Sequence, residues 1–210
     1  MALDLEEQEK VAELKAWWKH YGALLILALV AAVLAVGGVQ WWRAYQRNQA
    51  AQAGMLYETL SKAVQADDAK ALREAGGALA EGYPSTLQAS LGALVAARYY
   101  FDRNDLKNAR AQLQWVVERS PSEDMRDLAR LRLAAVLLDD KALDEALKLL
   151  DERHAEAYDA QYAALKGDVL VAKNQAAEAK LAYRLALDKS GKSDGAFRES
   201  LRMRLDALGG

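Results

Sequence analysis

The chain has 210 residues, two prolines, no cysteine and a formal net charge of −2 at pH 7. Without cysteine it can form no disulfide and no thiolate site, and with so few prolines its many alanines and leucines favour helices throughout. Residues 43–210 carry 25 basic and 25 acidic side chains. Nucleic-acid binding needs clustered Lys and Arg, so this balance argues against a nucleic-acid partner. The predicted fold class is all-α.

An uncharged stretch of nineteen residues lies between two tryptophan pairs near the N-terminus. The stretch covers residues 21–39 and the pairs stand at 17–18 and 41–42. As a helix it would measure roughly 28 Å, close to the bilayer hydrocarbon thickness of about 30 Å, and indole rings favour membrane interfaces. A buried core helix needs no such flanks, and a cleaved signal peptide has a basic leader and a shorter apolar run. We predict a retained single transmembrane helix over residues 21–40, following an N-terminal segment over residues 1–20.

One face of this span carries small residues at intervals of four, three and three. Small faces let transmembrane helices approach closely, so this face is expected to pack against a membrane partner. Exposure of the same face to lipid is the alternative, because small residues are common in membrane spans. The face consists of Ala28, Ala32, Ala35 and Gly38.

The basic residues around the span do not decide its orientation. Orientation follows the balance of Lys and Arg on the two sides, and three basic residues precede the span while Arg43 and Arg47 follow it closely. A short polar N-terminal segment that stays in the cytoplasm, with the larger C-terminal part exported, is the arrangement that we expect.

The rest of the chain contains a helical repeat of about 34 residues. Equivalent alanines lie 37 and 33 residues apart, at Ala109, Ala146 and Ala179. A small residue stands twelve positions before each of them, at Ala97, Ala134 and Gly167. A period near 34 is typical of paired-helix repeats, and this pattern resembles the tetratricopeptide family over residues 85–188. We therefore expect a helix-pair solenoid after the span.

A weaker copy of the repeat precedes these three, and Gly76 and Gly77 lie within its second helix. Glycine is a poor helix former, so the copy reads as degenerate. A last apolar helical pattern would cap the open end of the stack. The predicted segments are residues 41–84 for the connecting helix and degenerate first repeat, 85–191 for the tetratricopeptide repeats and 192–210 for the capping helix.

The tetratricopeptide resemblance implies a concave surface lined by the first helix of each pair. Several positions that face this surface in the family are large and apolar here, and an exposed apolar groove usually marks a binding site. Arg98 would stand at the edge, where it could meet a carboxylate. A foreign protein segment, the chain's own helix over residues 43–65, or a second copy could fill the groove. The expected protein-binding groove consists of Leu91, Leu94, Arg98, Phe101, Leu128, Leu131, Leu138 and Val171.

The chain lacks the residue groups of common active sites. Its two histidines, His20 and His154, are isolated, and it has no motif for a nucleophile with its base, a phosphate-binding loop or a metal. The acidic pair Asp67 and Asp68 stands at a predicted turn, where helix capping explains it. We expect no enzymatic activity, no cofactor and no metal.

Longer segments carry a resemblance to a known family. EEQEKVAELKAWWKHYG precedes the span, and the repeats read LGALVAARYYFDRNDLKNARAQLQWVVE, LARLRLAAVLLDDKALDEALKLLDE and ALKGDVLVAKNQAAEAKLAYRLAL. Together they closely resemble the YfgM family of bacterial inner-membrane proteins. The resemblance implies a cytoplasmic N-terminus, a periplasmic repeat domain, and binding to the SecYEG translocon and a PpiD-like periplasmic chaperone.

From this resemblance we expect the chain to assist the release and folding of secretory proteins, with unfolded secretory chains as clients. The alternative is a periplasmic scaffold for envelope assembly that is unrelated to the translocon.

Overall fold

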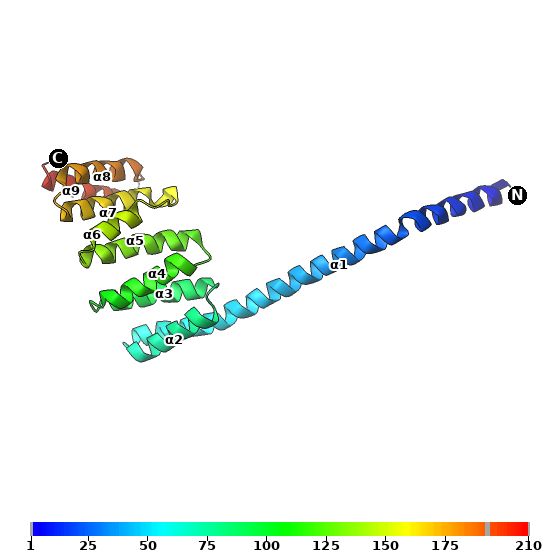
Figure 1. Ribbon diagram of the computed structural model, residues 1–210, viewed down its shortest axis with the longest axis horizontal. Helices are drawn as coiled ribbons and strands as arrows, with labels where there is room; N and C mark the ends of the chain where they lie inside the picture. The colour runs from blue at the N-terminus through cyan, green and yellow to red at the C-terminus, as the bar shows by residue number, and fades with distance from the viewer. Residues whose placement is uncertain (1, 192–193, 210) are drawn as a thin grey trace. The chain divides into compact units, whose positions relative to one another are not determined.

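The computed structural model describes residues 2–191 and 194–209, without the side chains of residues 2–9 and of Ala28. Every regular element in this part of the chain is a helix, so the predicted all-α fold is confirmed (Figure 1). The elements are α1 (Ala2–Gln65), α2 (Ala69–Gly82), α3 (Leu87–Phe101), α4 (Leu106–Arg119), α5 (Glu123–Asp139), α6 (Leu143–Leu150), the 3₁₀ turn η1 (Glu156–Tyr158), α7 (Asp159–Ala172), α8 (Ala176–Lys189) and α9 (Gly195–Ala207).

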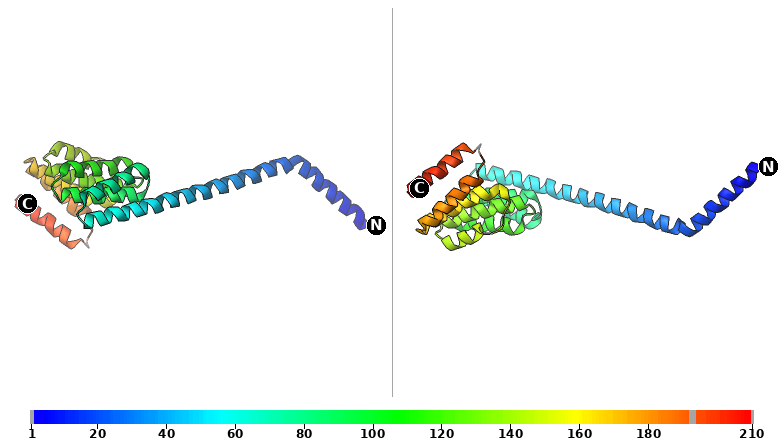
Figure 2. Two further views of the ribbon diagram at one scale, coloured as in Figure 1. Left: turned by 90° about the horizontal axis from the view of Figure 1, so that it is seen from below. Right: turned by 90° about the horizontal axis from the view of Figure 1, so that it is seen from above.

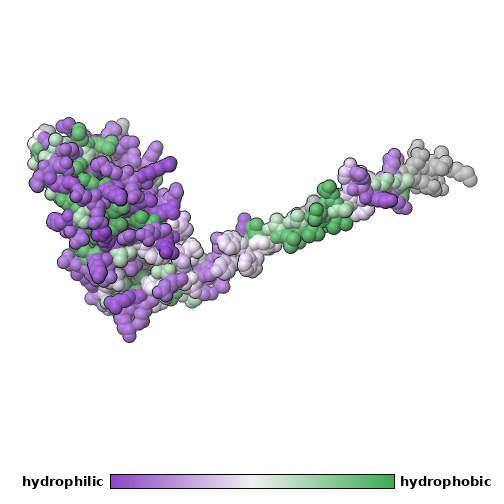
Figure 3. Space-filling model, viewed as in Figure 1, coloured by the Kyte–Doolittle hydropathy of each residue, from purple (hydrophilic) through white to green (hydrophobic). Residues whose placement is uncertain are grey.

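Helix α1 contains the predicted span. Its large apolar side chains from Leu24 to Val39 are exposed, with Leu27 at 69% and Leu34 at 70%, and Figure 3 shows them as an apolar stretch between more hydrophilic segments. By length and composition the helix can cross a membrane. Exposing this much apolar surface to water is unfavourable, so α1 supports association with a membrane.

The chain divides into two units, one ending at Asn48 and one beginning at Gln49. In the second unit, helix pairs are stacked in chain order (Figures 1 and 2). The end of α1 packs with α2, and the pairs α3–α4, α5–α6 and α7–α8 follow. Each helix from α2 to α9 contacts the next one along the chain. The core is therefore continuous through the stack, as expected for a tetratricopeptide-like solenoid.

One turn geometry closes all four helix pairs. A residue with φ between 54° and 61° stands in each turn, at intervals of 37, 37 and 33 residues: Asp67, Asn104, Lys141 and Asn174. The N–H of the following residue donates to the carbonyl oxygen five residues earlier, as from Asp105 to Tyr100 at 2.9 Å. This is the Schellman arrangement that ends many helices. The pair formed by α1 and α2 has the same turn, so it is a repeat of the same kind as the other three.

A small residue meets a large one where the helices of a pair cross. A Cβ added to Gly167 would lie 2.4 Å from the ring of Tyr183. The first pair reverses the order, because Leu60 on α1 is large and a Cβ added to Gly76 on α2 would lie 3.6 Å from Leu60 Cδ1. The reversal explains why this copy looked degenerate in the sequence. The equivalent buried positions of the middle pairs are Ala97 with Leu113 and Ala134 with Leu150.

Helix α9 covers the end of the stack. Leu201 and Leu205 are buried in a cluster with residues of α7 and α8. The Arg204 guanidinium donates to both carboxylate oxygens of Asp168 on α7 at 2.8 Å, and the Tyr183 hydroxyl donates to the same carboxylate at 2.8 Å. One half-buried carboxylate thus joins the last three helices.

Candidate functional site

A cavity of about 410 Å³ opens between α3 and α5, the first helices of two neighbouring pairs. It forms because these two helices contact each other far less than each contacts α4. Residues of α3 and α5 line most of it, and α4 contributes one side chain. The lining residues are Leu94, Ala97, Arg98, Phe101, Leu113, Arg132, Ala135 and Val136.

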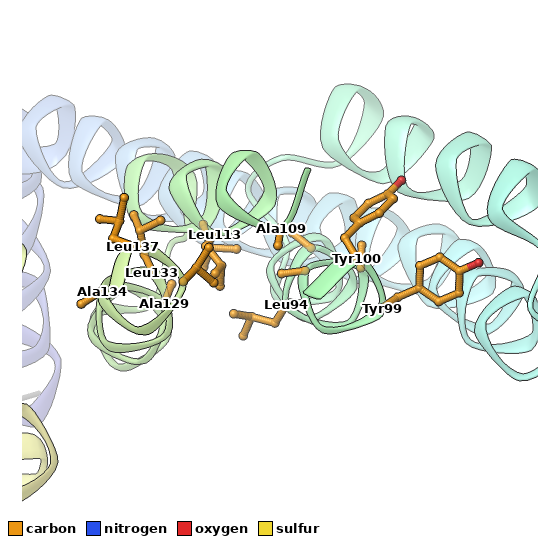
Figure 4. Packing of buried hydrophobic residues seen from close by; sticks show 14 of the residues in the cluster. Leu94, Tyr99, Tyr100, Ala109, Leu113, Ala129, Leu133, Ala134 and Leu137 are labelled. Atoms are coloured by element: carbon orange, nitrogen blue, oxygen red, sulfur yellow. The ribbon is translucent and has the colours of Figure 1, made fainter. Parts of the chain in front are cut away.

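The interior of the cavity is apolar and largely fixed by the core. Leu94, Leu113 and Val136 are at most 5% exposed, and Figure 4 shows the first two within the buried cluster where α3, α4 and α5 meet. Phe101 and Ala135 are half-buried. A preformed apolar surface of this kind can bury an apolar side chain without rearrangement of the core.

Two arginines stand among the lining residues, and only one is engaged. Arg98 Nε donates to Asp102 Oδ2 at 2.8 Å, one helical turn further along the chain. Exposed Arg132 forms no hydrogen bond or ion pair with any described residue. None of the described lining residues is acidic. The site can therefore accept an apolar group together with a negative charge.

The structure brings three of the eight predicted groove residues to this cavity, namely Leu94, Arg98 and Phe101. On α5, Leu128, Leu131 and Leu138 are half-buried and pack against the core. Leu91 on α3 is half-buried, and Val171 on α7 is 40% exposed. The part of these five residues in a wider groove stays a prediction.

The end of α1 does not reach this cavity. Its buried residues Ala53 and Leu60 pack with α2 and α3, and no described residue of α1 lines the cavity. The part of α1 that belongs to the repeat unit, residues 49–65, therefore does not fill this cavity.

The part of the site that α5 provides was not predicted from the sequence. Arg132, Ala135 and Val136 lie at intervals of three and four residues, so they share one helical face. The family positions carried over to α5 pointed instead to its leucines. The sequence feature that could have indicated this face is Arg132, an arginine next to the small Ala135 and the β-branched Val136.

The small face of the span lies within α1. Ala32 and Ala35 are exposed, and no side chain approaches the place of a Cβ at Gly38 within 4 Å. The side chain of Ala28 lies outside the described residues. The described part of this face, Ala32, Ala35 and Gly38, is exposed, and its packing role stays a prediction.

Several polar groups elsewhere in the stack make structural contacts. The Tyr162 hydroxyl donates to the carbonyl oxygen of Asp127 at 2.7 Å, and burial raises the pKa of this tyrosine to about 12. Hydrogen bonds from Tyr99 and Arg103 lower the pKa of Asp67. Across the residues that the structure describes, no group of three or more His, Asp or Glu could hold a metal ion.

Comparison with known proteins covers almost the whole chain. The family described as "Tetratricopeptide repeat-like domain" matches residues 15–210. Proteins named "Ancillary SecYEG translocon subunit" are 30% identical in Haemophilus influenzae and 33% identical in Neisseria gonorrhoeae, each over 99% of this chain and 100% of the relative. The protein of that name in Escherichia coli is 29% identical over 96% of both chains. No solved structure matches. The chain belongs to the YfgM family, whose repeat region is a tetratricopeptide repeat-like domain.

Proposed function

We propose that this protein is an ancillary subunit of the SecYEG translocon, anchored in the inner membrane by α1. The observation that carries the proposal is the length of the match. Relatives with that name align with both the apolar stretch of α1 and the whole repeat unit. A likeness restricted to the repeats would fit any protein that binds others through helix pairs.

On this proposal the repeat unit lies in the periplasm, binds a PpiD-like chaperone and assists the release and folding of secretory proteins. A stack of helix pairs offers the extended surface with which such proteins bind partners. The cavity between α3 and α5 adds a preformed apolar site to that surface.

The test is copurification from bacterial inner membranes in a mild detergent. A tagged full-length chain should enrich SecYEG and the PpiD-like chaperone above an abundant, unrelated inner-membrane protein. The matched controls are a chain whose residues 21–40 are replaced by an unrelated single span and a chain that ends after Asn48. They report separately on the contacts of the span and of the repeat unit.

Recovery of SecYEG at the level of the unrelated membrane protein would refute the translocon assignment. Recovery of SecYEG without the chaperone would leave the translocon assignment intact and refute the finer one.

A further inference from the structure

We infer that the cavity between α3 and α5 binds a protein segment in which an acidic side chain stands next to a large apolar one, and that Arg132 selects the acid. This inference deepens the proposed function, because it states the chemistry of the segment that the repeat unit accepts. It assigns the selecting charge to Arg132, while the sequence had pointed to Arg98.

The two guanidinium groups at the cavity differ in whether they already have a carboxylate partner. Arg98 already has a carboxylate partner in Asp102, at 2.8 Å. Arg132 has no hydrogen bond or ion pair to any described residue. An unpaired guanidinium next to an apolar interior is stronger toward a carboxylate than one in open water, since the low-polarity wall reduces screening. The positive charge of Arg132 can therefore pair with one side-chain carboxylate of a bound segment.

The interior of the cavity has room for an apolar side chain. The buried side chains of Leu94, Leu113 and Val136 line a cavity of about 410 Å³, and half-buried Phe101 is a further apolar lining residue. Apolar residues that enter preformed pockets are the usual anchors of protein interfaces. Arg132 is itself one of the residues that line the cavity. In a bound segment, a carboxylate can therefore reach Arg132 while a neighbouring apolar side chain enters the cavity.

The experiment selects short protein segments displayed on phage, with both ends joined to flanking sequence, against the full-length chain in lipid nanodiscs. Wild type should enrich segments in which Asp or Glu adjoins Leu, Ile, Phe or Met. Arg132→Glu should switch the enriched charge from acidic to basic. For a purified acidic segment the substitution should weaken binding about tenfold or more, as for a central interface residue.

Two further variants separate the cavity from the rest of the surface. Ala135→Trp fills the cavity from a half-buried position, so it should abolish binding while the melting temperature is preserved. Arg184→Glu reverses another exposed arginine, on α8, that lines no part of this cavity, and it should change neither the selected segments nor their affinity. Arg132→Gln, which removes the charge without reversing it, should weaken binding less than Arg132→Glu.

The inference fails if wild type selects no segments, if the selected segments show no acidic preference, or if Arg132→Glu selects the same segments as wild type. It also fails if Ala135→Trp binds as wild type does. Copurification with SecYEG is measured independently, so a chain that recovers the translocon but selects no acidic segment would overturn this inference alone.

Discussion

Among the described glycines, Gly167 has the least room for a side chain, because the ring of Tyr183 occupies the place of its Cβ. The equivalent residues Ala97 and Ala134 carry a Cβ, and leucines stand at the positions opposite them. The size of the first-helix residue therefore follows the size of its partner. The sequence indicated that all three positions need small residues, but the requirement for glycine depends on which ring rotamer Tyr183 adopts in the folded stack.

Gly167→Ala should lower the free energy of unfolding by about 1–3 kcal/mol, the range for an overpacked core. Urea unfolding of the full-length chain in detergent, followed by circular dichroism, measures the change. Adding Tyr183→Leu recreates the combination of Ala134 with Leu150 and should recover part of the loss.

The matched control for this experiment is Gly77→Ala. No atom lies within 4 Å of the place of its Cβ, so the same substitution within α2 should raise stability by about 1 kcal/mol through helix propensity. Equal effects of the two substitutions would contradict the packing argument.

At the scale of the elements, the backbone geometry of the Schellman turn is the same in all four repeats, whereas the residue type at its left-handed position varies. Aspartate, asparagine and lysine all occupy the left-handed position, which asparagine and aspartate tolerate better than lysine. Lysine at position 141 is thus the least suited residue in the series.

Lys141→Gly should raise the free energy of unfolding by about 0.5–1 kcal/mol, because glycine adopts positive φ without a Cβ clash. Lys148→Gly, within α6, is the control and should destabilise the protein by about 1 kcal/mol. Chemical denaturation reports both. A loss of stability on Lys141→Gly would mean that the lysine side chain makes a contribution that outweighs its backbone strain.

The helix pairs could be predicted from the sequence, while half of the cavity could not. Regular spacing of buried residues, as at Ala109, Ala146 and Ala179, fixes which helix face points inward. The cavity depends instead on the distance between α3 and α5 after both have packed on α4. The spacing of residues within α5 contains no information on that distance. The sequence therefore did not indicate Arg132, whereas it indicated Arg98 at the edge of the groove, although the charge of Arg98 is already paired.

At the scale of the whole molecule, an apolar stretch with tryptophan flanks is joined to a repeat unit with an apolar cavity and no described metal-binding group. The first feature supports a location at the membrane and the second supports binding of protein segments. Which side of the membrane carries the repeat unit is a prediction that rests on family resemblance.

Protease added to intact spheroplasts should digest residues 49–210, because the proposed orientation exports them. Immunoblotting against a C-terminal tag measures the loss, and a cytoplasmic protein that stays intact shows that the membrane is sealed. Protection of the tag in spheroplasts, with digestion only after lysis, would reverse the proposed topology.

The reversed size order of Leu60 and Gly76 restricts which helices can pair while the chain folds. Another second helix placed on α1 would bring Leu113, Leu150 or Tyr183 against Leu60, where two large side chains would collide. Helix α2 placed on α3 would set Gly76 opposite Ala97 and leave a void. Mispaired intermediates, in which α1 or α2 pairs with a helix of another repeat, are therefore disfavoured, so the apparent degeneracy of the first repeat helps to fix the register in which the other repeats assemble.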